Sequence, residues 1–291
     1  MLKKICKHTV PYLPDVESPT MRNTLNTAVR LTVLATAVLG ATVFGTAAQA
    51  ATTVTPGQFK VGMEITYPPF ESYDEKKNVV GSDPDLSRLL AKHMDLKAEF
   101  VDTKFSSLIL SLNAGHYDAI ISGMYITPER QTQAQTIAYA KTGAAIMVLK
   151  DSTIKPKVPE DLCGLKVGLE KGTTWVAQFN KLSTDYCVPN NKGAISVSEF
   201  PSAPEVTQAL LSGNVQAQVE IDGAAGMIAE RTKGRVVVST EHSIYQQTLG
   251  IYVKKGNDEL YQALLKAFDE TKKSGEYAAL LKKYNLEEPT N

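Results

Sequence analysis

Hydrophobic and polar residues alternate in short blocks from Phe59 onward, and the spacing within the blocks changes between two periods. Short apolar runs bounded by Gly or Pro indicate strands, whereas apolar residues three or four positions apart indicate amphipathic helices. The runs predict strands at 59–65, 97–101, 117–122, 165–169, 194–200, 216–221 and 250–254. Because strands and helices follow each other in turn, the pattern predicts a layered α/β fold.

Start and stop signals support the predicted helices. Ser82, with an acidic residue three positions later, predicts a helix N-cap, and Thr127 followed by Pro128 predicts a second helix start. Gly115 ends a predicted helix over 107–114. Further helices are predicted to follow the sequence Gly172-Thr173-Thr174, to cover 204–211 and 258–274, and to include Tyr277 and Leu280 near the C-terminus.

Two segments of the chain resemble each other. In 111–119 and again in 210–217, an apolar helix ends at Gly and leads into a strand. Pro156 and Pro159 lie in a linker between these segments. The repetition is consistent with two similar α/β lobes.

Composition narrows the class of protein without fixing its function. The 291 residues are 43% hydrophobic and 21% charged, which is typical of a globular chain. Lys+Arg and Asp+Glu each number 31, so the formal net charge is zero. A nucleic-acid-binding protein usually has a basic excess or a basic stripe, and this sequence has neither. A charged cleft is still compatible with a neutral chain.

The N-terminus has the pattern of a secretory signal. Arg22 and Arg30 precede an apolar stretch at 31–45, and Ala48-Gln49-Ala50 forms a small-residue cleavage site. We therefore expect residues 1–50 to be a signal peptide, cleaved after Ala50, that exports the protein to the periplasm. The alternative is a membrane anchor, but a spanning helix needs about 20 apolar residues. Translation could start at Met1 or at Met21.

Two cysteines, Cys163 and Cys187, remain in the exported part of the chain. An even pair in an oxidising compartment predicts a disulfide, which would contribute about 3 kcal/mol by constraining the unfolded chain. The alternative is two free thiols. Two cysteines without clustered histidines do not make a zinc site, so we expect neither a metal nor a cofactor.

A series of short motifs carries a family resemblance. The motifs are VGME at 61–64, YPPFE at 67–71, GSDPDL at 81–86, DAIISGM at 118–124, ITPER at 126–130, VG at 167–168, KGTT at 171–174 and SGEY at 274–277. In this order and spacing the chain resembles the family 3 extracellular solute-binding proteins, the periplasmic components of polar amino-acid ABC importers. The resemblance covers nearly all of the mature chain.

The resemblance implies a type II periplasmic-binding fold, in which two α/β lobes are joined by two crossover strands. Lobe 1 would comprise 51–142 and 245–291, and lobe 2 would comprise 143–244. A small amino acid or related carboxylate would bind between the lobes, which would close about a hinge. The expected partner is an ABC permease in the inner membrane, and the protein is expected to be a monomer that binds no nucleic acid.

The resemblance places the ligand carboxylate at Arg130, which lies in the first turn of a predicted helix. A guanidinium can hold a carboxylate through two parallel hydrogen bonds. Ser122 and Gly123 match positions at a strand end that meet the ligand. The alternatives are that Arg130 pairs with a surface acid and that Ser122 and Gly123 form an ordinary turn.

Residues of the second lobe and two aromatic side chains complete the expected pocket. Thr173 and Thr174 would close on the carboxylate, although a helix N-cap alone would also explain them. Tyr67 and Phe105 match aromatic positions that enclose the ligand side chain, with core packing as the alternative. Trp175, the only tryptophan, would either stack on the ligand or cover the core.

Acidic residues bear on the ligand class. Glu64 falls where many relatives carry Asp, and Glu170 lies beside the turn of the second lobe. Two acids at the cleft favour a cationic ligand such as arginine, lysine or ornithine. Either acid could instead be a solvated surface charge.

Two positions depart from the family pattern where the ligand α-ammonium is usually held. Tyr125 stands in place of Ser or Thr, and Ile221 falls where an Asp is expected. A shift of one residue would restore the carboxylate through Asp222. An opine, a modified amino acid or another small carboxylate would therefore also fit.

Two other classes of protein share this fold. A dehydratase-like enzyme would need a buried acid, for which Glu64, Glu170 and Glu220 are the candidates. The sequence contains no HExxH, GxSxG or P-loop motif, so we expect a binding protein and not an enzyme. A sensor that reports its ligand to a membrane receptor would use the same binding chemistry.

Overall fold

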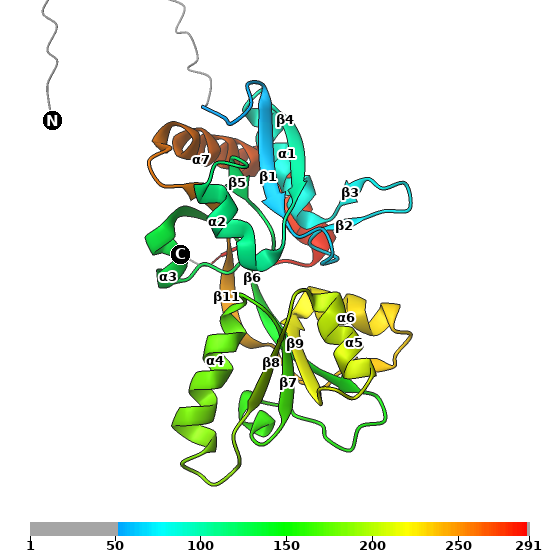
Figure 1. Ribbon diagram of the computed structural model, residues 1–291. Coiled ribbons are helices and arrows are strands. Elements are labelled where there is room, and N and C mark those ends of the chain that lie inside the picture. Colours follow the sequence, from blue (N-terminus) through cyan, green and yellow to red (C-terminus); the bar gives the residue numbers. More distant parts are fainter. Residues whose placement is uncertain (1–51, 290–291) are drawn as a thin grey trace, which may run out of the picture. The chain divides into compact units, whose positions relative to one another are not determined.

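The computed structural model describes residues 52–289, so the predicted signal peptide at 1–50 and its cleavage site lie outside the described residues (Figure 1). The strands are β1 (Gln58–Met63), β2 (Ser72–Tyr73), β3 (Val79–Val80), β4 (Lys97–Asp102), β5 (Ala119–Ile120), β6 (Ala134–Leu149), β7 (Lys166–Glu170), β8 (Ser196–Phe200), β9 (Ala217–Ile221), β10 (Val236–Val238) and β11 (Ile244–Lys254).

The α-helices are α1 (Ser82–His93), α2 (Leu108–Asn113), α3 (Pro128–Gln133), α4 (Thr174–Leu182), α5 (Ala203–Leu211), α6 (Asp222–Arg231), α7 (Asp258–Lys273) and α8 (Glu276–Tyr284). Three single turns are η1 (Phe105–Ser107), η2 (Pro159–Leu162) and η3 (Ser183–Cys187). None of the described helices is long and apolar enough to cross a membrane.

Two long antiparallel strands, β6 and β11, connect two α/β lobes. Along the sheet of the described residues the order is β4-β1-β5-β11-β6-β9-β7-β8, with β10 beside β6. β1 pairs in parallel with β4 and β5, and β7 pairs in parallel with β8 and β9. β11 joins the first group through β5, and β6 joins the second through β9. This topology confirms the predicted type II periplasmic-binding fold.

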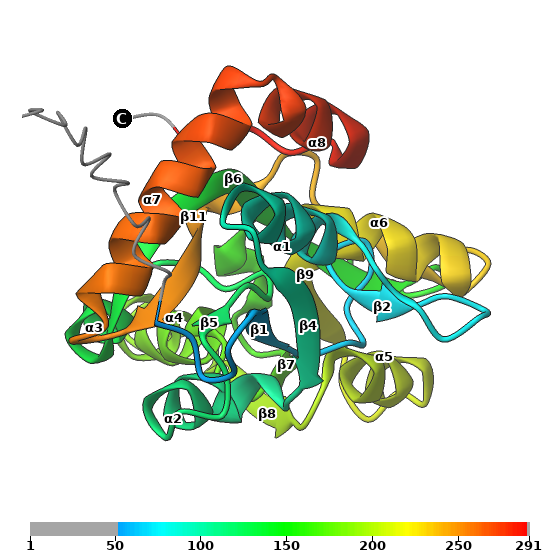
Figure 2. The same cartoon turned by 90° about the horizontal axis from the view of Figure 1, so that it is seen from above.

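Helices pack on both sides of each group of strands. Figure 1 shows α1, α2 and α7 around β1, β4 and β5, and it shows α4, α5 and α6 around β7, β8 and β9. Figure 2 shows α7 and α8 lying together beside α1, and helix α1 packs on both. Phe59, Leu86 and Leu264 are fully buried in lobe 1, and Val167, Phe179 and Val206 are fully buried in lobe 2. Each lobe therefore has an apolar core, and the carboxyl ends of its parallel strands face the crossover region.

Several predicted boundaries differ from the structure. Ser82 is the first residue of α1 and not its N-cap, because Gly81 occupies the cap position with φ 135°. A side chain at Gly81 would lie 2.1 Å from the carbonyl oxygen of Phe70, so only glycine fits there. The predicted helix at Thr127 is confirmed, and the Thr127 hydroxyl accepts a hydrogen bond from the Arg130 N–H at 3.1 Å.

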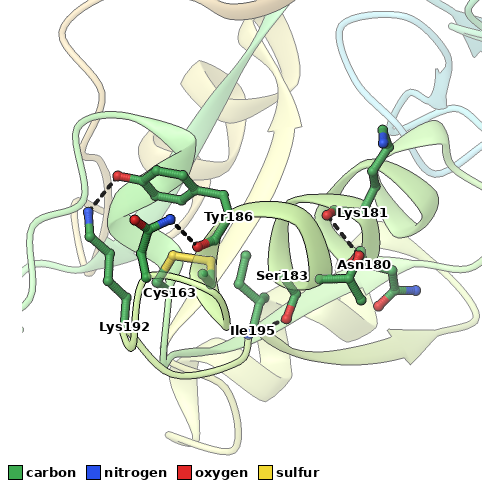
Figure 3. Close-up of a disulfide and its surroundings, with 10 residues drawn as sticks. Cys163, Asn180, Lys181, Ser183, Tyr186, Lys192 and Ile195 are labelled. Carbon is green, nitrogen blue, oxygen red and sulfur yellow. Dashed lines mark hydrogen bonds between the residues drawn. A yellow bond between two sulfur atoms is a disulfide. The ribbon is translucent and has the colours of Figure 1, made fainter.

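The predicted disulfide between Cys163 and Cys187 is present in lobe 2 (Figure 3). It links the end of η2 to η3, with the two Cα atoms 5.3 Å apart. Around it, Lys192 Nζ donates to the Tyr186 hydroxyl at 2.6 Å. The Ile195 N–H donates to the Ser183 hydroxyl at 2.9 Å. The disulfide therefore fixes the turn that follows α4, the helix whose N-terminus faces the other lobe.

Candidate functional site

A pocket lies between the two lobes, at the carboxyl ends of β1, β5, β7 and β9. Open α/β sheets bind ligands at this edge. The pocket brings together every predicted ligand-binding residue except Asp222. It is lined by Glu64, Tyr67, Glu71, Phe105, Ser122, Gly123, Tyr125 and Arg130 from lobe 1 and by Glu170, Thr173, Thr174, Trp175 and Ile221 from lobe 2.

Arg130 is fixed in the wall of this pocket. Its Nη1 donates to the carbonyl oxygen of Tyr125 at 2.7 Å, and its Nη2 donates to that of Gly172, across the lobes, at 2.9 Å. The guanidinium lies over the Phe105 ring, 5.5 Å from the centroid. None of the ion pairs between described residues includes Arg130. Because a guanidinium has five N–H donors, it retains donors for an anion in the pocket.

The N-terminus of α4 faces the same space. Thr173 is the N-cap residue, but its hydroxyl donates to the carbonyl oxygen of Glu170 at 2.8 Å and makes no capping hydrogen bond. Thr174 Oγ1 and Trp175 Nε1 are buried, and neither has a hydrogen-bond partner among the described residues. A helix N-terminus presents free N–H groups and a positive dipole end. This end of the pocket therefore offers several donors to an anion.

Gly172 makes the close approach of the lobes possible. Its φ of 87° lies in the left-handed region, and a Cβ there would lie 3.0 Å from the Cα of Ser106. A side chain would therefore separate α4 from η1. The glycine of the KGTT motif thus brings the N-terminus of α4 close to Arg130.

Two buried acids occupy the pocket together with Arg130. Glu64 and Glu170, one from each lobe, are each 7% exposed. Glu64 Oε2 accepts a hydrogen bond from the Phe105 N–H at 2.9 Å, whereas Glu170 Oε1 is buried without a partner among the described residues. Burial, followed by the neighbouring Glu64, raises the pKa of Glu170 far above its usual range. A cation placed between Glu64 and Glu170 would favour the ionised form of Glu170 and so lower its pKa again.

A second carboxyl pair lies beneath the Ser122–Gly123 segment. The Ser122 hydroxyl donates to Glu71 Oε1 at 2.8 Å and accepts from the Glu64 N–H at 3.0 Å. The Gly123 N–H donates to Asp83 Oδ2 at 2.7 Å. Burial raises the pKa of Asp83 to about 6, and burial followed by the neighbouring Asp83 raises the pKa of Glu71 well above its usual range. The two acids therefore hold this strand end in place through their hydrogen bonds to Ser122 and Gly123.

Glu71 and Asp83 were not predicted as site residues. Both belong to motifs that carried the resemblance, YPPFE and GSDPDL, so their positions were marked in the sequence. Their contact with the Ser122–Gly123 segment depends on how the chain folds, and no local pattern indicates it.

Tyr67 joins the two lobes at another side of the pocket. Its hydroxyl donates to Glu220 Oε2 at 2.8 Å and accepts from the Ile221 N–H at 3.1 Å. The ring stacks on Phe70, with the centroids 5.7 Å apart. Burial raises the pKa of Glu220 to about 7. Glu220 thus acts on the pocket through Tyr67, whereas Ile221 lines the pocket directly.

The structure places Asp222 outside this pocket. Ile221 ends β9 at the pocket wall, and Asp222 begins α6. The Asp222 carboxylate accepts a hydrogen bond from the Ser243 hydroxyl and lines a separate cavity beside Gly143. Asp222 therefore does not supply a carboxylate at the position where the family pattern has Asp.

Tyr125 fills part of the space that smaller residues would leave. Its hydroxyl donates to the carbonyl oxygen of Gly143 in β6 at 3.2 Å. Its ring meets Trp175 edge-on, with the centroids 6.1 Å apart. Tyr125 thus connects lobe 1 to the crossover strand and to α4.

The described residues contain no group of three or more His, Cys, Asp or Glu side chains that could hold a metal ion. The polar groups of the pocket are instead arranged for a small molecule with charged ends. Arg130 and the N-terminus of α4 suit an anionic group, and Glu64 with Glu170 suits a cationic one.

The chain is similar in sequence to a family of known proteins. The sequence profile of the bacterial extracellular solute-binding proteins, family 3, matches residues 59–287. The histidine-binding periplasmic protein of Escherichia coli K12 is 32% identical over 245 residues, which cover 81% of this chain and 91% of that protein.

Two solved structures have a similar fold. An ancestral arginine-binding protein bound to arginine is 35% identical with a TM-score of 0.72, and the match covers 78% of this chain and 98% of that one. An ancestral amino acid-binding protein, described as a precursor of cyclohexadienyl dehydratase, is 32% identical with a TM-score of 0.66. That match covers 78% of this chain and 95% of that one. This chain therefore belongs to the bacterial extracellular solute-binding proteins of family 3.

Proposed function

We propose that this protein is the substrate-binding component of an ABC importer and that it binds an amino acid with a cationic side chain. The observation that carries the proposal is the presence of Arg130 and the two buried acids Glu64 and Glu170 in one pocket. A ligand with a carboxylate at one end and a cation at the other matches both charges.

The carboxylate would lie between Arg130 and the N-terminus of α4. Arg130 would give two N–H donors, and the Thr174 hydroxyl and the first amides of α4 would give more. The Thr173 hydroxyl already donates to the Glu170 carbonyl, so we assign it a supporting role in the turn. Ser122 and Gly123 would meet the ligand from the lobe 1 side, where Glu71 and Asp83 hold them.

The cationic group would lie between Glu64 and Glu170. Burial raises the pKa of Glu170, so a guanidinium or ammonium next to it would favour its ionised form and would donate charge-assisted hydrogen bonds to both acids. Tyr67 and Phe105 would enclose the methylene groups between the two ends of the ligand. The histidine-binding and arginine-binding relatives named above support a ligand of this class.

A second candidate ligand is an opine or another carboxylate without a primary α-amine. Ile221 is apolar, Tyr125 has its hydroxyl on the Gly143 carbonyl, and Asp222 lies in a separate cavity. These three placements remove the acidic partner that an α-ammonium would normally find at the end of β9.

Ligand binding would close the lobes, with 51–142 and 245–291 moving against 143–244 about β6 and β11. An inner-membrane permease would recognise the closed monomer in the periplasm, after a signal peptide has been removed behind Ala50. We further propose that the ligand is bound unchanged, without catalysis, cofactor or metal, and that nucleic acid is not a partner.

Thermal-shift measurements on the mature chain from Ala51 test the proposal. The protein is first unfolded and refolded to remove co-purified ligand, and it is then screened with L-arginine, L-lysine, L-ornithine, L-histidine, L-glutamate and opines. Ligand at 1,000 times its Kd stabilises by about 4 kcal/mol, which moves the midpoint by several degrees. A shift with basic amino acids alone supports the first candidate, and a shift with opines alone supports the second.

Mass spectrometry of the ligand after incubation separates binding from turnover. Recovery of the same mass supports a binding protein. A new product that the Glu170→Gln variant does not form would support an enzyme and overturn the proposal. A screen without any shift would overturn both candidate ligands.

A further inference from the structure

We propose that Glu220 is a positioning residue that couples closure of the two lobes to the uptake of one proton, because the closed cleft buries its carboxyl group against Tyr67 of the other lobe. The proposal rests on the hinged closure described above, but it does not depend on the identity of the ligand. It assigns a role to a buried acid that ligand binding alone does not use.

The bond between Glu220 and Tyr67 crosses the cleft. Tyr67 belongs to the loop after β1 in lobe 1, and Glu220 belongs to β9 in lobe 2. The hydroxyl of Tyr67 donates to Glu220 Oε2 at 2.8 Å. The same hydroxyl accepts from the N–H of Ile221, which also belongs to β9, at 3.1 Å. Opening of the cleft must break both hydrogen bonds and expose the carboxyl group to water.

Glu220 is held within its own lobe by neutral groups. Its Oε1 accepts from Gln218 Nε2 at 3.0 Å, and that amide nitrogen also donates to the Thr207 hydroxyl of α5 at 3.1 Å. Glu220 is 1% exposed, and none of the ion pairs between described residues includes it. Its charge in the closed form is therefore compensated by hydrogen bonds only.

The ionisable groups around Glu220 favour its protonated form. Glu64, which follows β1, raises the pKa of Glu220 further, and the charge of Glu220 in turn raises the pKa of Glu170 and that of Tyr125. Helix α5 contributes one ionisable residue near this cluster, Glu205, and its charge raises the pKa of Glu170. Arg130, the cation of the pocket, is engaged by the carbonyl oxygens of Tyr125 and Gly172.

The direction of the pH dependence follows from these contacts. The pKa of Glu220 is about 7 in the closed form, whereas a solvated glutamate has a pKa of about 4.3. Closure therefore takes up a proton between these two values. The extra stability of the closed form is complete below the solvated value and is lost as the pH rises through about 7. Between pH 5 and pH 8 the closing equilibrium of the empty protein should fall on the order of 100-fold.

Trp175 provides a direct signal for closure. It is the only tryptophan of the chain, it is 3% exposed, and its ring meets Tyr125 of the opposite lobe. In ligand-free wild-type protein, its emission maximum should move to longer wavelength as the pH is raised from 5 to 8. The radius of gyration from small-angle X-ray scattering should increase over the same range.

Three variants make the test specific. Glu220→Gln has the shape of the protonated acid and retains a hydrogen bond to Tyr67, so it should lack the transition with a midpoint near pH 7. Tyr67→Phe removes a donor that stabilises the carboxylate, so the midpoint of the transition should move to higher pH. Glu199→Gln, at an exposed position of β8, should titrate as the wild-type protein does.

The proposal is overturned if ligand-free wild-type emission and radius of gyration are constant from pH 5 to pH 8. It is also overturned if Glu220→Gln titrates as the wild-type protein does, since another group would then be responsible. Because the test uses no ligand, a failed ligand screen leaves its result valid. A positive ligand screen with a flat pH profile would remove this proposal alone.

Discussion

Arg130 of lobe 1 donates a hydrogen bond from Nη2 to the carbonyl oxygen of Gly172 in lobe 2, over 2.9 Å. The residue proposed to hold the ligand carboxylate thus also connects the two lobes. Because Gly172 immediately precedes Thr173 and Thr174, this bond brings the guanidinium to the N-terminus of α4. On the proposed function, ligand affinity and lobe closure would therefore depend on the same side chain.

The first prediction concerns Arg130. Replacement by Lys keeps the positive charge but loses the planar fork and the bond to one of the two carbonyl oxygens. We expect Arg130→Lys to weaken ligand binding about 100-fold, which corresponds to roughly 2.7 kcal/mol. Isothermal titration calorimetry measures this, with Arg88→Lys on the exposed face of α1 as the matched control. An unchanged Kd for Arg130→Lys would remove Arg130 from the carboxylate site.

The second prediction concerns Glu170. Its pKa is raised in the folded protein, so its contribution to stability is complete only below its unfolded pKa and is lost as the pH rises through the folded value. Glu170→Gln should therefore raise the melting temperature of ligand-free protein at pH 8. The same change should reduce the thermal shift caused by a basic amino acid, because the cation loses one partner.

Scanning calorimetry at pH 8, with and without ligand, measures both effects of Glu170→Gln. Glu199→Gln is the matched control, because its side chain is exposed. A ligand-free variant that melts below the wild-type protein would show that the Glu170 carboxylate stabilises the fold. An unchanged ligand shift would place the cationic group elsewhere.

The sequence predicted most of the residues that line this pocket because they lie in short motifs. Arg130, Thr173 and Thr174 sit at helix starts that Pro128 and Gly172 mark locally. By contrast, the local pattern did not predict the 16-residue strand β6, because its small residues and Gly143 give no clear alternation, and only the family resemblance implied a crossover strand there. Its extended conformation is supported by pairing with β9, β10 and β11, which are distant in sequence.

The position of Asp222 shows a second limit of local patterns. Counting along the chain places Ile221, Asp222 and Glu220 within one residue of the expected carboxylate. The side chains of neighbouring strand residues point to opposite faces, so a shift of one residue changes the neighbours completely. Glu220 meets Tyr67, Ile221 lines the pocket, and Asp222 starts α6 beside Ser243. The register of β9 and the start of α6 decide which of these three residues faces the pocket.

The third prediction concerns the disulfide. Reduction, or the double replacement of Cys163 and Cys187 by Ser, should lower the free energy of unfolding by about 3 kcal/mol. The Kd of the ligand should change less than threefold. The nine residues of α4, roughly 14 Å of helix, separate this turn from Thr174 at the pocket. Urea denaturation and calorimetry measure the two quantities, and a large loss of affinity with unchanged stability would contradict the prediction.

The last prediction distinguishes Glu71 from Asp83. Burial raises the pKa of both acids; the neighbouring Asp83 raises the pKa of Glu71 further, whereas the hydrogen bond from Glu71 lowers that of Asp83, so we expect Glu71 to be the protonated acid of the pair. Glu71→Gln imitates the protonated acid and should bind ligand within about threefold of the wild-type affinity. Asp83→Asn replaces the oxygen that accepts from the Gly123 N–H and the Tyr139 hydroxyl, so it leaves buried donors unpaired. An unpaired buried donor costs about 1–3 kcal/mol.

We therefore expect Asp83→Asn to lower the free energy of unfolding by at least that amount and to weaken ligand binding about tenfold. Urea denaturation measures the free energy of unfolding of both variants, and calorimetry measures their ligand affinity. Asp85→Asn, at a partly exposed position nearby, is the control. Equal losses for Glu71→Gln and Asp83→Asn would show that both carboxyls are ionised. In that case Ser122 and Gly123 would be held by two negative charges, and the ligand cation would have to compensate them as well as Glu64 and Glu170.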